Sequence, residues 1–159
     1  MSMPQHFFVV VISQQYEGGG ELAAATAALF QRNWGGIRPY VIGSCTHYSI
    51  RPALARACLR RGVPVGNSIS PSFLDPRRID LWLGLDEGGV ELARSIIKGR
   101  GPAPGGFYRH VFPEPVVAFG EPLPYPPPDE SQLDAWLDLL IPMLDPWIER
   151  IWAAFGDSS

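Results

Sequence analysis

A glycine-rich turn and the acidic residue that follows it form the first segment with the residue types needed for chemistry. Gly18, Gly19 and Gly20 run directly into Glu21, which opens a predicted helix. The positive end of a helix dipole favours a carboxylate and keeps it ionised, so Glu21 could orient a base or bind a substrate. A first-turn glutamate that only stabilises its helix is the alternative, and the sequence leaves both open.

The second such segment, Ser44 to Tyr48, contains Cys45 and His47. A thiol and an imidazole can act as nucleophile and base. Residues two apart on an extended chain point to the same side without necessarily touching, and no third group that would orient the imidazole is evident. The alternative is that Cys45 and Cys58 are reduced, half-buried thiols, and no spacing of cysteine or histidine predicts a metal site.

Paired arginines provide a third candidate. Arg77 and Arg78 lie in a predicted polar loop, and planar guanidinium groups suit a phosphate such as that of pantetheine or a glycerophosphate. Arginines exposed to solvent in a loop are the alternative. The residues predicted to bind substrate are Gly18, Gly19, Gly20, Ser44, Arg77 and Arg78.

An alternation of apolar strands and amphipathic helices is predicted to position these candidates. The continuous apolar run from Phe7 to Ser13 is typical of a central strand that is buried on both faces. The order β-α-β-α-β predicts an α/β fold, with a mostly parallel central sheet and helices on both faces, in a single domain over residues 1–159. Further strands are predicted at 38–43, 63–67, 79–85, 107–112 and 115–119, and helices at 21–33, 49–61 and 87–98.

The C-terminal helix is predicted to be amphipathic and very apolar. Trp136 and Met143 widen its leucine stripe, Pro142 is predicted to break or kink it, and Asp145-Pro146 to restart it. The helix could be wedged into the core. Alternatively, it could present an apolar band to a partner or to a bilayer interface, which would give a homo- or hetero-oligomer or a peripheral membrane contact.

Composition narrows the class of protein. The chain has 159 residues and a formal net charge of −3, so a basic face for nucleic acid is not expected. The apolar run near the start is too short to span a membrane and lacks the basic region of a signal peptide. These features predict a cytoplasmic protein, with contact at the inner membrane as the alternative, and no bound cofactor.

Several segments, taken together in order, resemble a known family. Ile12-Ser13-Gln14-Gln15 followed by Gly20-Glu21-Leu22 resembles the strand-turn-helix of the lysophospholipid acyltransferase superfamily. The resemblance continues in the same order through residues 41–45, 53–65, 88–93 and 116–128. It implies an α/β acyltransferase that moves a fatty acyl group from an acyl-carrier protein (ACP) or coenzyme A (CoA) thioester to a hydroxyl group.

The same resemblance implies a departure from the family's histidine–carboxylate pair. Glu21 matches the carboxylate, while Tyr16 stands where the histidine base would be. This implies a diverged or non-catalytic member that binds an acyl chain or carrier protein. It could also pair with a histidine-bearing acyltransferase subunit in a lipid or polyketide/fatty-acid complex. An active acyltransferase and an unrelated α/β interaction module of the immunity type are the alternatives.

Overall fold

The computed structural model describes residues 8–33, 40–75, 78–79, 81–100, 110–111, 117–118 and 121–151. Its strands are β1 (Phe8–Ile12), β2 (Tyr40–Ser44), β3 (Leu81–Gly84), β4 (His110–Val111), β5 (Val117–Ala118) and β6 (Glu121–Pro122). Its α-helices are α1 (Gly19–Asn33), α2 (Pro52–Arg60), α3 (Glu87–Arg100) and α4 (Leu133–Ile151). Two short 3₁₀ helices, η1 (Pro71–Phe73) and η3 (Glu130–Gln132), complete the set.

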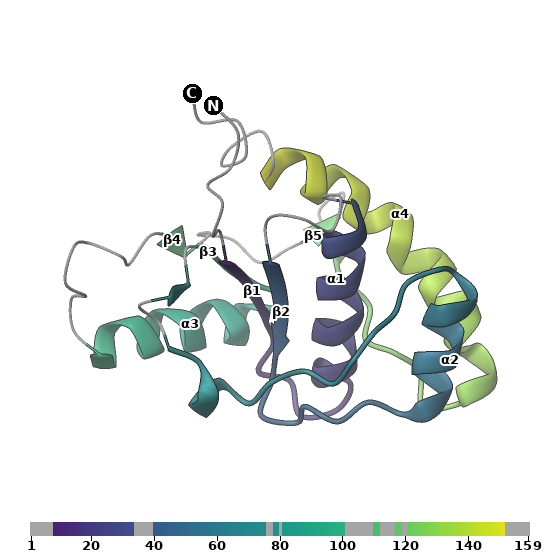
Figure 1. Cartoon of the computed structure of the whole chain (residues 1–159), viewed down its shortest axis with the longest axis horizontal. Coiled ribbons are helices and arrows are strands. Elements are labelled where there is room, and N and C mark those ends of the chain that lie inside the picture. Colours follow the sequence, from purple (N-terminus) through teal and green to yellow (C-terminus); the bar gives the residue numbers. More distant parts are fainter. Residues whose placement is uncertain are drawn as a thin grey trace.

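Four parallel strands form the central sheet, in the order β2-β1-β3-β4. In Figure 1, α3 lies on one side of this sheet, and α1, α2 and α4 lie on the other. Strands β5 and β6 make a separate antiparallel pair. The predicted α/β fold class, with a mostly parallel sheet and helices on both faces, is confirmed.

The central strand β1 divides the apolar core in two. Val9 and Val11 belong to the cluster that includes buried residues of α1, α2 and α4. Val10 and Ile12 belong to the cluster on the α3 side, together with Trp82. Side chains alternate between the two faces of a strand, so a strand covered on both faces reads as a continuous apolar run.

One predicted strand is absent. Residues 63–67 form an irregular connection. Two residues later, Ile69 makes an isolated parallel bridge to Ser44. Pro64 has no N–H to donate to a ladder, and Gly62 turns the chain with a φ of 69°. The third strand of the sheet is therefore β3. Most residues of the strands predicted at 107–112 and 115–119 lie outside the described residues.

The predicted break at Pro142 and restart at Asp145-Pro146 are wrong, while a kink at Pro142 stays a prediction. Helix α4 runs through both Pro142 and Pro146. Each proline removes a hydrogen bond to the carbonyl four residues earlier, on Asp138 and Pro142 respectively. Asp138, Pro142 and Pro146 are all exposed, so water can hydrogen-bond to the carbonyl oxygens of Asp138 and Pro142. The opposite side of the helix stays anchored in the core.

The apolar stripe of α4 packs inside the protein. Its buried residues are Leu133, Trp136, Leu137, Leu140, Leu144, Trp147 and Ile148. Met143 is partly buried against the same cluster, while Leu139 is 55% exposed. This arrangement favours the core-wedged interpretation of the helix, while oligomer formation through it stays a prediction. No helix among the described residues has the length and apolar character needed to cross a bilayer.

Candidate functional site

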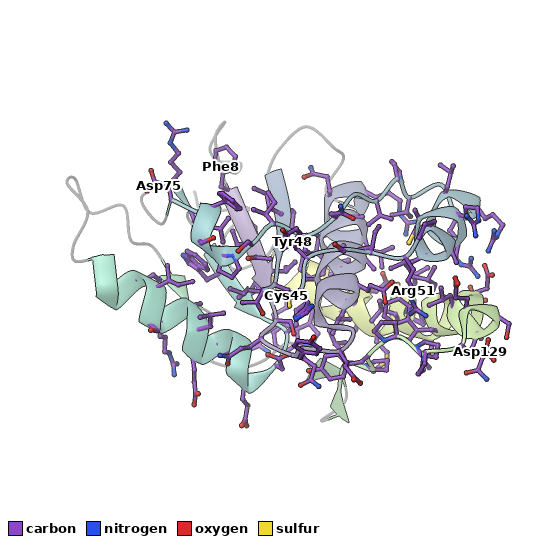
Figure 2. The ribbon with its side chains drawn as sticks, turned by 90° about the horizontal axis from the view of Figure 1, so that it is seen from below. Phe8, Cys45, Tyr48, Arg51, Asp75 and Asp129 are labelled. Atoms are coloured by element: carbon purple, nitrogen blue, oxygen red, sulfur yellow. The ribbon has the colours of Figure 1, made fainter. Side chains whose placement is uncertain are left out.

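Three neighbouring strands end at the same edge of the sheet, and each is followed by a polar or reactive side chain. Ser13 follows β1, Cys45 follows β2, and Asp86 lies two residues beyond β3. Strand β1 has β2 on one side and β3 on the other, so this edge is a topological switch point, where open α/β sheets bind ligands. Figure 2 shows Cys45 at the end of the strands away from Phe8.

Asp86 is the centre of a hydrogen-bond cluster at this edge. The Ser13 hydroxyl donates to Asp86 Oδ2 over 2.5 Å, and the Tyr125 hydroxyl donates to the same oxygen over 2.7 Å. The backbone N–H of Gly89 donates to Oδ1 over 2.6 Å. Burial, together with the hydrogen bond to Asp86, raises the pKa of the Tyr125 phenol. Tyr125 therefore keeps its proton at neutral pH and remains a donor.

The loop between β1 and α1 is held between two other segments. Gly18 has a φ of 80°, and a Cβ there would come within 2.9 Å of Pro126 Cδ. A Cβ on Gly20 would overlap the backbone carbonyl oxygen of His47. Both glycines are required by these close approaches. The predicted binding glycines thus lie beside Ser13, with Gly18 at the end of the loop and Gly19 and Gly20 in the first turn of α1.

Cys45 and His47 do not form a pair. The Cys45 thiol is buried and donates to the Gln15 carbonyl oxygen over 3.5 Å. Burial raises the pKa of this thiol, which disfavours the reactive thiolate. The His47 ring instead contacts the ring of Tyr16, with centroids 3.6 Å apart and an interplanar angle of 62°. Tyr16 is 67% exposed, so this pair lies on the surface beside the loop.

Glu21 is engaged by Arg51. The guanidinium Nε and Nη2 donate to both carboxylate oxygens over 2.9–3.2 Å, and the backbone N–H of Arg51 adds a bond of 3.0 Å. The same guanidinium donates to the carbonyl oxygens of Pro127 and Pro128, each over 2.8 Å. The hydrogen bonds to Glu21 raise the pKa of the Arg51 guanidinium. We call this arrangement the Glu21–Arg51 clasp.

The clasp has a direct consequence for the cluster around Asp86. Pro127 and Pro128 follow Tyr125 closely in the chain, so Arg51 fixes the segment that carries the Tyr125 hydroxyl to Asp86. Figure 2 shows Arg51 between Cys45 and Asp129, which caps the start of the C-terminal helical segment. The sequence places Arg51 among the solvent-facing arginines of the second helix, and its position before Pro52 gives no sign of this role.

The remaining predicted residues lie elsewhere. The Ser44 hydroxyl is buried and donates to the Ile69 carbonyl oxygen over 2.8 Å, so it stabilises a bridge. Arg78 is exposed, precedes β3, and contacts Asp75 over 4.0 Å. It lies at the amino end of that strand, away from the cluster, and Arg77 lies outside the described residues. Among the described residues there is no group of three metal-binding side chains.

Sequence reasoning missed Ser13, Asp86 and Tyr125 as site residues. Ser13 and Asp86 each follow the end of a parallel strand, and that position is a usable signal in an α/β chain. Tyr125 lies in a proline-rich segment with no local sign of function. Only the folded chain shows that its hydroxyl reaches Asp86.

Comparisons with known proteins identify the fold. No protein-family model and no curated protein matches this chain. It is similar to the solution structure of a low-molecular-weight protein tyrosine phosphatase from Bacillus subtilis, with 14% identity, a TM-score of 0.58, and coverage of 92% of this chain and 98% of that one. It is also similar to the tyrosine phosphatase Wzb from Escherichia coli K30, solved with sulphate, with 14% identity, a TM-score of 0.59, and coverage of 91% and 97%.

A third similar structure is the arginine phosphatase YwlE. In that structure a cysteine is replaced by serine and the active-site serine is phosphorylated. The identity is 15% and the TM-score 0.57, with 91% of this chain and 95% of that one covered. A likeness at this level of identity shows that the chain has the low-molecular-weight phosphatase fold.

The acyltransferase resemblance is therefore wrong. The fold is that of the phosphatases, so the chain is neither a non-catalytic relative (a pseudoenzyme of lipid metabolism) nor an active acyltransferase. The immunity-type module does not fit either. The short motifs, met in the same order, reflect a β-α-β-α layout that many α/β folds share. Acyl-ACP or acyl-CoA as donor, and a carrier protein or acyltransferase subunit as partner, were predicted from that resemblance and stay predictions.

Proposed function

We propose that this protein is a phosphatase in which the Ser13 hydroxyl is the nucleophile and Asp86 is its base. The observation that carries the proposal is the 2.5 Å hydrogen bond from Ser13 Oγ to Asp86 Oδ2, at the switch point of the sheet and beside the start of α1. A hydroxyl that donates to a carboxylate is the arrangement of an activated nucleophile. The phosphorylated serine of the YwlE variant supports serine as a phosphate acceptor in this fold.

In the proposed reaction, Ser13 Oγ attacks the phosphorus of a phosphate ester and Asp86 accepts the hydroxyl proton. The new oxygen–phosphorus bond forms as the bond to the leaving oxygen breaks, and Asp86 passes its proton to that oxygen. A water molecule then attacks the phosphoserine and gives a proton to Asp86. Asp86 returns this proton to the departing Ser13 oxygen, which releases inorganic phosphate and restores both side chains.

The surroundings of Ser13 define how a substrate would enter. Ser13 has 0% exposed surface, and the hydroxyl of Tyr125 donates to the same Asp86 oxygen. A substrate must therefore break the Tyr125–Asp86 hydrogen bond to reach the nucleophile. Tyr125 is 37% exposed, so its side chain has solvent to move into.

The charge of the loop defines what the site would favour. Between Ser13 and Gly20 the only charged residue is Glu17, which is acidic. Phosphate would then be held by backbone N–H groups and the dipole at the start of α1. With no basic side chain in the loop and Asp86 close by, the monoanion of a phosphate ester should bind better than the dianion. The second pKa of such esters is about 6, so kcat/KM should fall as pH rises above about 6.

Hydrolysis of p-nitrophenyl phosphate by the purified chain tests the proposal. Ser13→Ala and Asp86→Asn should each abolish the release of p-nitrophenol, while Ser72→Ala, at an exposed serine of η1, should retain the full rate. Mass spectrometry of the quenched reaction should find phosphate on Ser13. A wild-type chain that hydrolyses neither this ester nor phosphotyrosine peptides nor phosphoarginine would refute a phosphatase. Full activity of Ser13→Ala would refute Ser13 as the nucleophile.

A further inference from the structure

A separate cavity lies beside the edge strand of the sheet. It has a volume of about 420 Å³, with one wall formed by Ala24, Ala27 and Ala28 of α1 and another by the connection at 64–67. Strand β2 forms the floor through residues 41–43. The cavity lies alongside β2 and not at the carboxyl ends of the strands, so none of its residues belongs to the Ser13–Asp86 cluster. Its volume falls within the range of small-molecule sites, roughly 300–1,000 Å³.

The backbone of β2 presents hydrogen-bonding groups to this cavity. The bond from Ser13 N–H to the Ser44 carbonyl oxygen, 3.1 Å, shows that the even-numbered residues of β2 face β1. Successive backbone groups of a strand alternate in direction, so Val41 and Gly43 direct their N–H and C=O groups away from β1. They point to the position where a further strand would lie.

Two of these four outward groups have partners. The Val41 N–H donates to Gln31 Oε1 over 2.7 Å. The Gly43 carbonyl accepts from the Ile69 N–H over 2.8 Å. The Val41 carbonyl and the Gly43 N–H have no hydrogen-bond partner within the described part of the chain. An edge strand presents backbone groups that a ligand can bind, so this donor and acceptor are available to a molecule in the cavity.

The spacing of the open pair defines the ligand. In a parallel ladder, one residue of the neighbouring strand donates its N–H to the carbonyl of residue i and accepts from the N–H of residue i+2. Gln31 and Ile69 already cover the groups on either side, so there is room for one residue and not for a strand. The alanine wall suits an aliphatic side chain. Arg32 lines the same cavity at the Val41 end, and its Nη1 donates to the Arg61 carbonyl oxygen over 3.4 Å.

We propose that this cavity binds an N-acylated apolar amino acid. The amide N–H of the ligand donates to the Val41 carbonyl, and one carboxylate oxygen accepts from the Gly43 N–H. The aliphatic side chain lies against Ala24, Ala27 and Ala28. This site is independent of the proposed phosphatase chemistry, because it uses none of the residues assigned to that reaction.

Titration of the full chain with N-acetyl-L-leucine, followed by ¹H–¹⁵N NMR, tests the proposal. The Gly43 amide resonance should shift on binding and saturate with the probe. Ala28→Leu, which fills the cavity from a partly exposed position, should weaken binding by at least about tenfold. Ala135→Leu, at an exposed position of α4, is the matched control and should bind as the wild type does.

An altered probe tests the contact with the Val41 carbonyl. N-acetyl-N-methyl-L-leucine lacks the donor for the Val41 carbonyl and should bind about tenfold more weakly. An unshifted Gly43 amide at saturating millimolar probe would overturn the proposal, as would equal affinity in wild type and Ala28→Leu. Because binding is read by NMR, the result stands whether or not the chain hydrolyses phosphate esters.

Discussion

Replacing Arg51 with methionine should destabilise the protein by an amount that follows from the geometry of the Glu21–Arg51 clasp. The Glu21 side chain is 10% exposed and that of Arg51 is 29% exposed. Methionine keeps the apolar stem but removes every guanidinium bond, so Glu21 retains only the backbone N–H of residue 51. Leaving a buried charge unpaired costs about 3–5 kcal/mol, and the partial exposure of Arg51 places this case at about 3 kcal/mol.

Two companion substitutions separate the contributions within the clasp. Glu21→Gln keeps an acceptor for the guanidinium and leaves Arg51 with partial access to water, so we expect a loss of about 1–2 kcal/mol. Arg51→Lys keeps the charge opposite Glu21 but cannot also bond both prolyl carbonyls, because an ammonium group lacks the planar fork. It should lose about 1–2 kcal/mol. The double variant Arg51→Met with Glu21→Gln should lose less than the sum, since no charge is then left unpaired.

Urea unfolding followed by circular dichroism measures these differences as changes in the free energy of unfolding. The expected order of loss is Arg51→Met first, with Arg51→Lys and Glu21→Gln similar to each other. Arg60→Met is the control, because the Arg60–Asp134 pair is largely exposed and should contribute less than about 1 kcal/mol. A loss below about 1 kcal/mol for Arg51→Met, or additive losses in the double variant, would refute the reasoning.

Three further outcomes follow from single contacts. Gly20→Ala should destabilise the chain by about 3 kcal/mol or more in urea unfolding, because its Cβ would overlap a backbone carbonyl, whereas Gly66→Ala meets nothing within 4 Å and should be tolerated. Burial raises the pKa of Cys58 to about 11 from 9.0, so the unfolded chain releases this proton first. Stability should therefore fall by about 2–3 kcal/mol as pH rises from about 9 to about 11, and Cys58→Ala should lack this component. Tyr125→Phe removes a hydrogen bond to Asp86 that a substrate must break, so kcat/KM for p-nitrophenyl phosphate should rise severalfold; a fall would show that the hydroxyl assists the reaction.

The elements that organise the fold could be predicted because their signals are local. A continuous apolar run marks β1, and helical periodicity marks α2 and α3. The strand predicted at 63–67 does not form, which shows the limit of such signals. Its apolar residues favour a strand, but Pro64 has no backbone N–H to donate to a neighbouring strand. The predicted acyltransferase family was wrong for a related reason. Short motifs report strand-turn-helix layout, whereas strand order and the return of the 123–128 segment to the end of β1 distinguish one α/β fold from another.

The site could be predicted only in part, because most of its contacts join residues far apart in the sequence. The glycine-rich loop was visible because Gly18, Gly19 and Gly20 adjoin a strand end. The Ser13–Asp86 hydrogen bond joins residues 73 apart, and Tyr125 reaches Asp86 from 39 residues further along. The residues around Ser13, Asp86 and Tyr125 give no sign that these side chains meet in the folded chain.

What separates Glu21 from Asp86 is the chemistry of their hydrogen-bond donors. Both are carboxylates near the same glycine-rich loop, and the sequence favours Glu21. A guanidinium group with five fixed donors occupies both oxygens of Glu21, and it cannot give up a proton at any ordinary pH. Asp86 accepts instead from the hydroxyls of Ser13 and Tyr125, which can lose and regain protons. Glu21 is therefore suited to holding the proline segment in place, and Asp86 to moving a proton.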